Sequence, residues 1–213
     1  MKFVLSRREF ALGAVAAATV AMMPVLAQAQ QDVAAELAKE SPLGDIALGD
    51  PKAPVTVIEY ASMTCTHCAH FNATTFPVLK AKYIDTGKVR YILREFPLDP
   101  LAAAGFMLAR CAGKDKFYPV VDLLFQQQQN WAFVDKPVDA LLATVKQAGF
   151  TKESFEACLN DQKMLDAVNE VRQRASDKLG VNSTPTFFIN GKKETGALEP
   201  DAMSKIIDAL LPK

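Results

Sequence analysis

Residues 55–68 read VTVIEYASMTCTHC, and this stretch decides the fold. The β-branched and aromatic side chains of residues 55–60 predict a buried strand. Residues 68–72 contain neither proline nor glycine and can begin a helix. Cys65 and Cys68, which are close enough in sequence to form a small reversible disulfide, therefore lie at a helix N-terminus. Unpaired backbone N–H groups and the helix dipole favour an anion there, and a thiolate is such an anion.

The segment after the cysteine pair predicts a second helix and a second strand. Thr75 and Pro77 predict a fresh helix start, because proline is tolerated in a first turn but not in a helix interior. This second helix should end near Asp85. Residues 86–87 (Thr-Gly) then predict a turn into a strand at 88–95. The order strand, helix, strand favours a parallel βαβ unit.

Residues 99–180 change character and show no convincing strand. The apolar spacing is helical, and lysine–aspartate, proline and glycine positions separate the segments. The glutamine run at 126–129 predicts a solvated helix end. The expected helices are 101–111, 117–128, 138–148, 151–159 and 161–179.

Strand patterns return near the C-terminus of the chain. Residues 186–189 are apolar, Asn190 and Gly191 predict a two-residue hairpin turn, and 192–195 form the return strand. Residues 201–211 predict an amphipathic helix. Without the helical block, βαβ followed by ββα surrounds one four-stranded mixed sheet.

This order is similar to an α/β, thioredoxin-like fold with an inserted all-helical subdomain. We expect the thioredoxin-like domain to comprise residues 51–98 and 181–213, with residues 99–180 as the helical insertion.

The first 29 residues have the pattern of an export signal. Three basic residues precede an apolar stretch at 11–25, and Ala-Gln-Ala at 27–29 matches a cleavage site. We expect cleavage after Ala29, with an uncleaved anchor as the alternative. Residues 6–10, SRREF, resemble a twin-arginine signal, and an ordinary secretory n-region with two adjacent arginines is equally compatible.

Cleavage would leave 184 of the 213 residues, enough for one domain with a core. Residues 1–29 carry three of the 24 basic and one of the 24 acidic residues, so 21 basic and 23 acidic residues remain, a net charge of −2. This balance does not suggest nucleic acid or a charged membrane surface as a partner. All four cysteines remain, which fits an oxidising compartment. Residues 30–50 are expected to be a leader with one short helix at 32–39.

The Cys-x-His-Cys pattern, the helical block and Thr184-Pro185 before an apolar strand resemble the DsbA-like thiol:disulfide oxidoreductases over residues 50–211. The position of Cys65 at the helix start and the resemblance both indicate that it is the nucleophile. Cys68, one turn further into the helix, would resolve a mixed disulfide. His67 could donate a hydrogen bond or a positive charge to the Cys65 thiolate. The alternatives are a structural disulfide or metal clip for the cysteines, and an exposed spacer for His67.

The resemblance also implies a substrate-binding surface. Pro185 would be cis and lie against the cysteine pair, and the Thr184 backbone would pair with substrate as an added strand. The alternative is an ordinary trans proline that starts an edge strand. Thr66 is assigned to the same surface. Two departures keep an isomerase or reductase open: the best-known oxidase has proline at the Thr66 position and valine at the Thr184 position, where threonine is common in isomerases.

Glu59 is an acid inside an otherwise apolar strand, six residues before Cys65. Such an acid must be paired, or neutral with a raised pKa. The resembled family has an acid at the matching position, which implies a role in moving the Cys68 proton. The alternative is a glutamate that is turned to solvent or ion-paired with Arg94.

Cys111 and Cys158 both fall in the helical block. We expect them to form a structural disulfide, with two separate buried thiols as the alternative reading.

The cysteine pair also has to be weighed as a metal or haem site. Cys65, Cys68, His67 and His70 could together bind a soft metal ion, although His70 has the pattern of a surface helix residue. Haem attachment needs histidine directly after the second cysteine, and Ala69 is there instead. We expect no cofactor and no bound metal.

The resemblance implies a periplasmic, monomeric dithiol oxidase. It would donate its Cys65–Cys68 disulfide to folding exported proteins that contain cysteines, and a membrane redox partner would reoxidise it. The alternatives are a disulfide isomerase or reductase of the same fold, and a metal-binding periplasmic chaperone.

Overall fold

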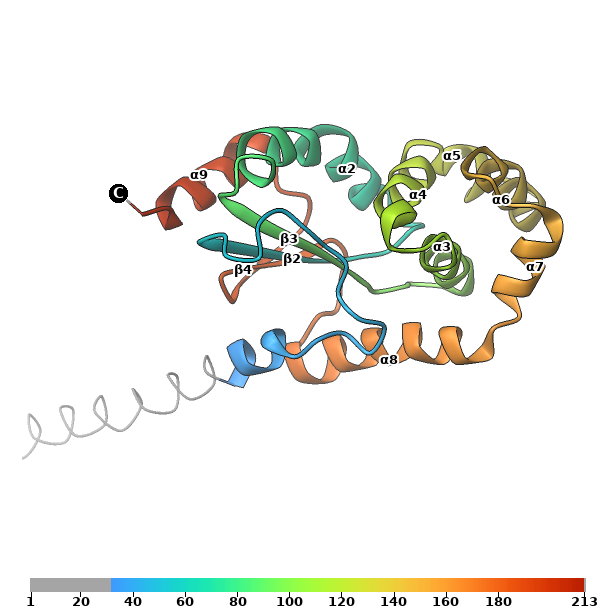
Figure 1. Cartoon of the computed structure of the whole chain (residues 1–213), viewed down its shortest axis with the longest axis horizontal. Helices are drawn as coiled ribbons and strands as arrows, with labels where there is room; N and C mark the ends of the chain where they lie inside the picture. The colour runs from blue at the N-terminus through green and yellow to red at the C-terminus, as the bar shows by residue number, and fades with distance from the viewer. Residues whose placement is uncertain (1–31, 213) are drawn as a thin grey trace, which may run out of the picture. The chain divides into compact units, whose positions relative to one another are not determined.

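The computed structural model describes residues 32–212 (Figure 1). The chain divides into two compact units after Lys39. In the first unit, residues 32–38 are helical, close to the expected range. The second unit begins at Glu40 and contains the sheet and the remaining helices. The expected export signal at 1–29 lies outside the described residues.

A five-stranded mixed sheet forms the centre of the second unit, in the order β1-β3-β2-β4-β5. Strands β2 and β3 are parallel, as the βαβ pattern predicts, and the other neighbours are antiparallel. The two-residue turn after β4 joins it to β5. The strands are β1 (Ala47–Leu48), β2 (Val55–Ala61), β3 (Val89–Glu95), β4 (Thr186–Ile189) and β5 (Lys192–Thr195).

Strand β1 corrects the sequence prediction, which assigned residues 30–50 to a leader and expected four strands. It pairs with the edge of β3, and the chain before it is tied down by Arg110. The Arg110 guanidinium donates to the backbone oxygens of Leu43 at 3.1 Å and Gly44 at 2.8 Å. A two-residue strand has no periodicity to detect, so its position depends on these distant partners.

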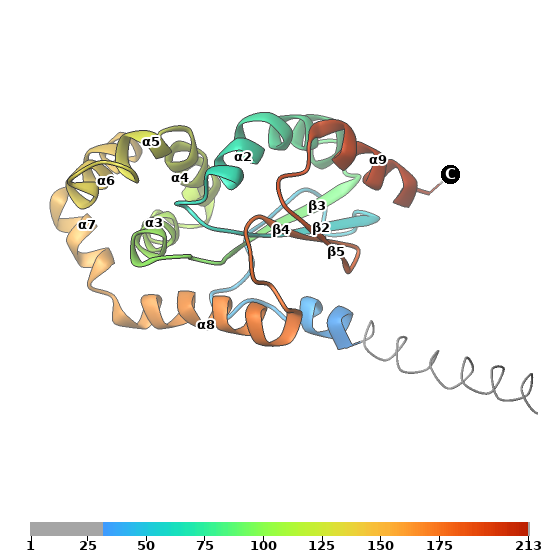
Figure 2. The same cartoon turned by 180° about the vertical axis from the view of Figure 1, so that it is seen from behind.

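Helices cover both faces of the sheet (Figures 1 and 2). Helix α2 (Thr66–Leu79) and helix α9 (Pro200–Leu210) pack together on one face, with a π-helical turn, η1 (Lys80–Ile84), after α2. Helix α8 (Gln162–Leu179) contacts β3 from the other face.

Helix α2 runs through Pro77 without a break, so the predicted fresh start at Thr75 is wrong. An interior proline removes one backbone donor and costs roughly 3 kcal/mol. Thr75 and Leu79, on either side of it, are 1% exposed, and the Phe76 ring packs at a tilt against Tyr91 of β3 with ring centroids 5.0 Å apart. Tertiary burial of this face keeps the helix continuous, because packing rather than local propensity supplies most helical stability in proteins.

The residues between β3 and β4 are helical, as predicted (Figure 1). Asp99 caps the first of these helices by accepting the Ala102 N–H at 2.8 Å, and Thr151 caps another through a reciprocal capping box. The expected helix at 117–128 instead ends at Gln126, and a separate short helix follows. The elements are α3 (Pro100–Cys111), α4 (Lys114–Gln126), α5 (Gln128–Trp131), α6 (Pro137–Val145), the 3₁₀ turn η2 (Lys146–Ala148), α7 (Lys152–Leu159) and α8.

A disulfide joins Cys111, the last residue of α3, to Cys158 in α7, with Cα atoms 6.2 Å apart. The closed loop holds 48 residues, because the two cysteines are 47 positions apart. The chain-entropy model gives about 4 kcal/mol for a loop of this length. We therefore expect the Cys111→Ser/Cys158→Ser double variant to lose about that much free energy of unfolding in a urea titration. An unchanged unfolding midpoint would show that the crosslink does not constrain the unfolded chain.

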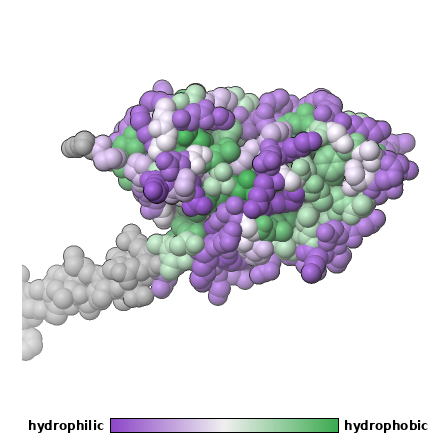
Figure 3. All heavy atoms as spheres, viewed as in Figure 1, coloured by the Kyte–Doolittle hydropathy of each residue, from purple (hydrophilic) through white to green (hydrophobic). Residues whose placement is uncertain are grey.

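The surface is mixed in character. Figure 3 shows hydrophobic residues emerging in several places among hydrophilic ones on one face. The large apolar side chains that are most exposed among the described residues are Val78, Leu98, Phe133, Val134, Val138 and Leu210. Among residues 32–212, no helix is both long and apolar enough to span a membrane.

Candidate active site

Cys65 lies between β2 and α2 and is the N-cap residue of α2, as the sequence predicts. Its backbone is extended, with φ −79° and ψ 117°, so its side chain projects at the start of the helix rather than within it. Cys65 is 9% exposed, whereas Cys68, one turn into the helix, is fully buried. Both cysteines are reduced in the structure.

The surroundings of Cys65 stabilise its thiolate. A hydrogen bond from the Cys68 thiol is the main cause that lowers the pKa of Cys65, from 9.0 to about 5. The Thr184 side chain and the backbone amides of Cys68 and His67 lower it further, and together they outweigh burial, which raises it. The two backbone amides are unpaired groups of the N-terminus of α2.

Cys68 has the opposite shift. Burial is the main cause that raises its pKa well above 9.0, and the hydrogen bond to Cys65 and the nearby Glu59 charge add to it. Near neutral pH the pair therefore holds one thiolate, at Cys65, and one thiol, at Cys68, because Cys65 gives up its proton and Cys68 keeps its own. Since the thiolate is the form of cysteine that reacts, these opposite shifts favour Cys65 over Cys68 as the nucleophile.

We expect iodoacetamide to alkylate Cys65 of the reduced full chain with a half-maximal rate near pH 5, because that is where its thiolate forms. Cys68 should stay unmodified up to pH 9, since burial keeps it protonated. Peptide mass spectrometry after quenching at each pH measures both sites. A Cys65 midpoint between pH 8 and 9, or earlier labelling of Cys68, would contradict this assignment.

Thr184 and Pro185 lie directly before β4 and reach the reactive cysteine. The bond between them is cis, and Pro185 is buried. The Cys65 thiol donates to the Thr184 backbone oxygen, with Sγ and O 3.3 Å apart. The Thr184 hydroxyl oxygen is buried without a hydrogen-bond partner in the described structure. This hydroxyl can donate to the sulfur when the thiol ionises, which agrees with its lowering of the Cys65 pKa.

Glu59 lies in the middle of the sheet, on the face that α2 covers. It pairs in register with Leu93 of β3 and Phe187 of β4, and it is 1% exposed. The Tyr91 hydroxyl donates a hydrogen bond to its carboxyl group. Burial is the main cause that raises the pKa of Glu59 to about 8, against the lowering effect of Tyr91. At neutral pH this acid therefore holds a proton and faces the helix that carries Cys68.

The alternative environment predicted for Glu59 is wrong, because the side chain neither faces solvent nor pairs with Arg94. Arg94 instead makes two hydrogen bonds to the Asp45 carboxylate, at 2.9 and 2.7 Å. Strand alternation explains the separation, since neighbouring residues of β3 point to opposite faces of the sheet.

Thr66 and His67 are exposed at the start of α2. The backbone amide of His67 helps to lower the Cys65 pKa, and the contribution of its imidazole ring stays a prediction. His70 is a surface residue, with Nε2 3.3 Å from Glu199 Oε1. Within residues 32–212, no three histidine, cysteine or acidic residues are grouped as a metal site.

Two residues of the helical block that the sequence analysis did not assign also hold the cysteine loop. Asp99 accepts a hydrogen bond from the Thr64 hydroxyl at 2.5 Å, and the Gln128 side chain donates to the backbone oxygens of Met63 and Cys65. The predicted solvated role of the glutamine run is wrong for Gln128, which is 2% exposed. A polar run gives no signal that one member is buried, because the burial depends on contacts 63 residues away.

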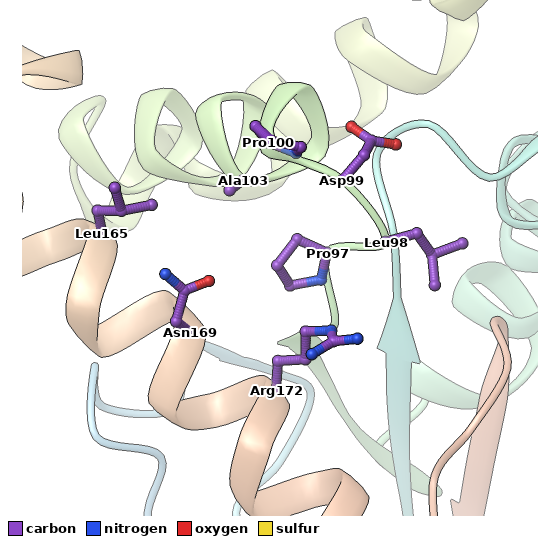
Figure 4. Close-up of a pocket in the computed structure, with 8 residues that line it drawn as sticks. All are labelled: Pro97, Leu98, Asp99, Pro100, Ala103, Leu165, Asn169 and Arg172. Atoms are coloured by element: carbon purple, nitrogen blue, oxygen red, sulfur yellow. The ribbon is translucent and has the colours of Figure 1, made fainter.

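A pocket of about 310 Å³ lies beside the cysteine loop without including either cysteine (Figure 4). One wall is the segment between β3 and α3, where Leu98 and Asp99 lie, and the other is α8, which contributes Leu165, Asn169 and Arg172. The Asp99 carboxylate connects this wall to Thr64. The pocket thus lies next to the loop that carries Cys65, and neither Cys65 nor Cys68 lines it.

Comparison with known proteins gives the family. The family model described as Thioredoxin matches residues 41–209. The chain belongs to the thioredoxin family. The "Probable disulfide bond formation protein D" of Bacillus cereus is 32% identical to this thioredoxin-family chain over 173 residues, which is 78% of each protein. The crystal structure of Wolbachia pipientis alpha-DsbA1 is 35% identical, with a TM-score of 0.73, and the match covers 78% of this chain and 90% of that one.

These relatives confirm that the chain is a DsbA-like member of the thioredoxin family, with the expected helical insertion. A Rickettsia felis protein named "Putative protein-disulfide oxidoreductase" is 36% identical over 168 residues, which cover 78% of this chain. The match spans 60% of that protein, so this DsbA-like chain corresponds to about three fifths of the Rickettsia relatives.

Proposed function

We propose that this chain is a thiol:disulfide oxidoreductase that donates its Cys65–Cys68 disulfide to folding exported proteins. The observation that carries the proposal is the pair of opposite pKa shifts at the start of α2, lowered to about 5 for Cys65 and raised for Cys68. The names of the relatives, disulfide bond formation protein and DsbA, support the same chemistry.

The proposed reaction transfers two electrons from client to enzyme. A client thiolate attacks the Cys65 sulfur, the Cys65–Cys68 bond breaks, and Cys68 leaves with the electron pair. The second client thiolate then attacks the client sulfur of the mixed disulfide, and Cys65 leaves as a thiolate. Two client thiolates become one disulfide, and the enzyme disulfide becomes two reduced cysteines. The low pKa of Cys65 makes it a good leaving group in the last step.

Glu59 supplies a proton where the first step needs one. Cys68 leaves as a thiolate in a fully buried position, where burial strongly favours its protonated form. Glu59 is protonated at neutral pH, and once it has given up its proton, its negative charge raises the pKa of Cys68. We therefore assign Glu59 to returning a proton to Cys68 and, in the reverse direction, to accepting it.

Client binding would use the backbone beside the reactive sulfur. Thr184 precedes β4, and its carbonyl oxygen lies 3.3 Å from Cys65 Sγ. An extended client segment that pairs with this backbone would place its own cysteine against Cys65 and would be read through its main chain. Thr66 and His67 are exposed next to this position and complete the contact surface. Such binding suits many client sequences.

The direction of transfer follows from the stability of the thiolate. Interactions that stabilise the Cys65 thiolate favour the reduced enzyme and therefore make the disulfide oxidising. The second candidate is an isomerase or reductase, which threonine at positions 66 and 184 favours. Equilibration of the full chain with glutathione buffers, followed by quantification of the Cys65–Cys68 state, separates them. We expect a potential of about −120 mV, and a value of about −270 mV would overturn the oxidase assignment.

We further propose that the chain acts in the periplasm as a monomer and that a membrane redox partner accepts its electrons. The basic, apolar and Ala-Gln-Ala segments of residues 1–29 support export. Protein recovered from the periplasm should begin at Gln30. An intact Met1 N-terminus in that fraction would contradict cleavage.

A further inference from the structure

The loop that carries the reactive cysteine, residues 62–65, is held by side-chain hydrogen bonds to the segment before α3 and to the helical block. Leu98 N–H donates to Ser62 Oγ at 3.2 Å, and the Thr64 hydroxyl donates to Asp99. Gln128 makes the most direct connection. Its Nε2 donates to Met63 O at 2.8 Å and to Cys65 O at 3.0 Å. Both protons of one amide group are therefore used on the two residues that flank Thr64.

We propose that Gln128 is a positioning residue, which holds the Cys65 loop through its side-chain amide and thereby sets the reactivity of the Cys65 sulfur. This inference rests on the proposed function, because it concerns the reactive thiol of that reaction.

Gln128 is held rigidly enough for this role. It is the first residue of α5, separated from the end of α4 by one residue, and it is 2% exposed. Three residues later, Trp131 is fully buried, and its Nε1 donates to Leu124 O of α4 at 2.8 Å. The junction between the two helices is thus fixed at both ends, so the Gln128 amide has a defined place against the loop.

Only one orientation of the Gln128 amide fits the two carbonyl acceptors. The opposite orientation would place Oε1 against both oxygens. In the orientation present, Oε1 is buried without a hydrogen-bond partner in the described structure. A buried acceptor without a partner is unfavourable, and such groups are rare in native proteins. The unpaired Gln128 Oε1 is therefore an unfavourable feature that accompanies the two hydrogen bonds from Nε2 to the Cys65 loop.

The donated bonds affect the sulfur in two ways. Cys65 O also accepts the Ala69 N–H at 3.1 Å as the first carbonyl of α2, so Gln128 reinforces the start of the helix whose amides stabilise the thiolate. The amide protons also offset the partial negative charge of the Met63 and Cys65 carbonyl oxygens, which belong to the loop that carries the sulfur. Loss of both effects disfavours an anion at Cys65.

Two variants of different charge test the proposal against a matched control. Gln128→Met keeps the length of the side chain and removes both donors, and Gln128→Glu also adds a carboxyl group. Gln129, the next residue of the same run, is exposed, so Gln129→Met is the control. We expect the alkylation midpoint of Cys65 in the reduced full chain to rise by about one pH unit in Gln128→Met, about 1.4 kcal/mol. The rise should be larger in Gln128→Glu and absent in the control.

Trp131 reports whether the helix junction survives, because it is the single tryptophan of the chain. A Gln128 variant with native Trp131 fluorescence and an unchanged Cys65 midpoint would overturn the proposal and leave Gln128 a purely structural residue. Because the Cys65 midpoints of variants are compared with one another, the result does not depend on the redox potential of the unmodified chain.

A measurement on the unmodified chain covers the case in which both variants misfold. The side-chain amide resonances of Gln128 should shift with the same midpoint as the Cys65 titration, whereas those of Gln129 should not move. Gln128 resonances that do not respond to Cys65 ionisation would contradict the proposal.

Discussion

The free energy of unfolding of the unmodified protein is expected to fall by on the order of 5 kcal/mol between about pH 4.5 and 8. In the Glu59→Gln variant this fall should be absent. Burial raises the pKa of Glu59 from 4.5 to about 8 in the folded state. Between these two values the unfolded chain binds fewer protons than the folded one, so stability falls as pH rises. Each pH unit of this difference is worth about 1.4 kcal/mol. The glutamine oxygen can still accept the Tyr91 hydrogen bond.

Urea unfolding of the oxidised protein at several pH values measures this effect without thiol titration at Cys65 and Cys68. Glu156→Gln is the matched control, because the Glu156 side chain is 57% exposed and pairs only across one helical turn with Lys152. The control should follow the unmodified protein. Parallel pH profiles for Glu59→Gln and the unmodified protein would show that Glu59 ionises without cost.

Cys65→Ser is expected to abolish the oxidation of a dithiol peptide, because a serine hydroxyl cannot form or donate a disulfide. The peptide disulfide is quantified by mass spectrometry after acid quenching. The Cys111→Ser/Cys158→Ser variant, assayed where it is folded, should retain the activity, since that disulfide lies in the helical block away from the start of α2. Peptide oxidation by Cys65→Ser above the rate of a buffer blank would remove Cys65 from the nucleophilic role.

Much of the fold could be predicted from local patterns. The β-branched and aromatic residues of β2 and the hairpin turn after β4 indicate strands directly, and the helical spacing between β3 and β4 indicates the inserted block. The junction of β2 and α2 also placed Cys65 at a helix start. These features depend on residues that are near neighbours in the sequence, so a single amino-acid sequence is enough to predict them.

The features that the sequence analysis missed depend on distant contacts. Strand β1 has two residues and exists because the edge of β3 is available. Pro77 stays inside α2 because the flanking residues are buried. Gln128 looks like its exposed neighbour Gln129 in the sequence, and only the fold brings its amide to the Cys65 loop.

The environment of Glu59 could be predicted only in part from the sequence. The sequence showed that an acid in an apolar strand must be paired or protonated. It could not choose between an ion pair with Arg94 and a protonated Glu59, because that choice depends on which face of the sheet each side chain occupies. The structure places Tyr91 next to Glu59, and Arg94 next to Asp45.

The transfer of the Cys65–Cys68 disulfide itself is the most direct test. Oxidised full chain is mixed with an excess of a reduced dithiol peptide, and the new protein thiols are trapped with acid and mapped by peptide mass spectrometry. We predict one peptide disulfide per protein molecule, with new thiols at Cys65 and Cys68 and an intact Cys111–Cys158 bridge. A peptide that stays reduced, or new thiols at Cys111 and Cys158 instead, would contradict the account.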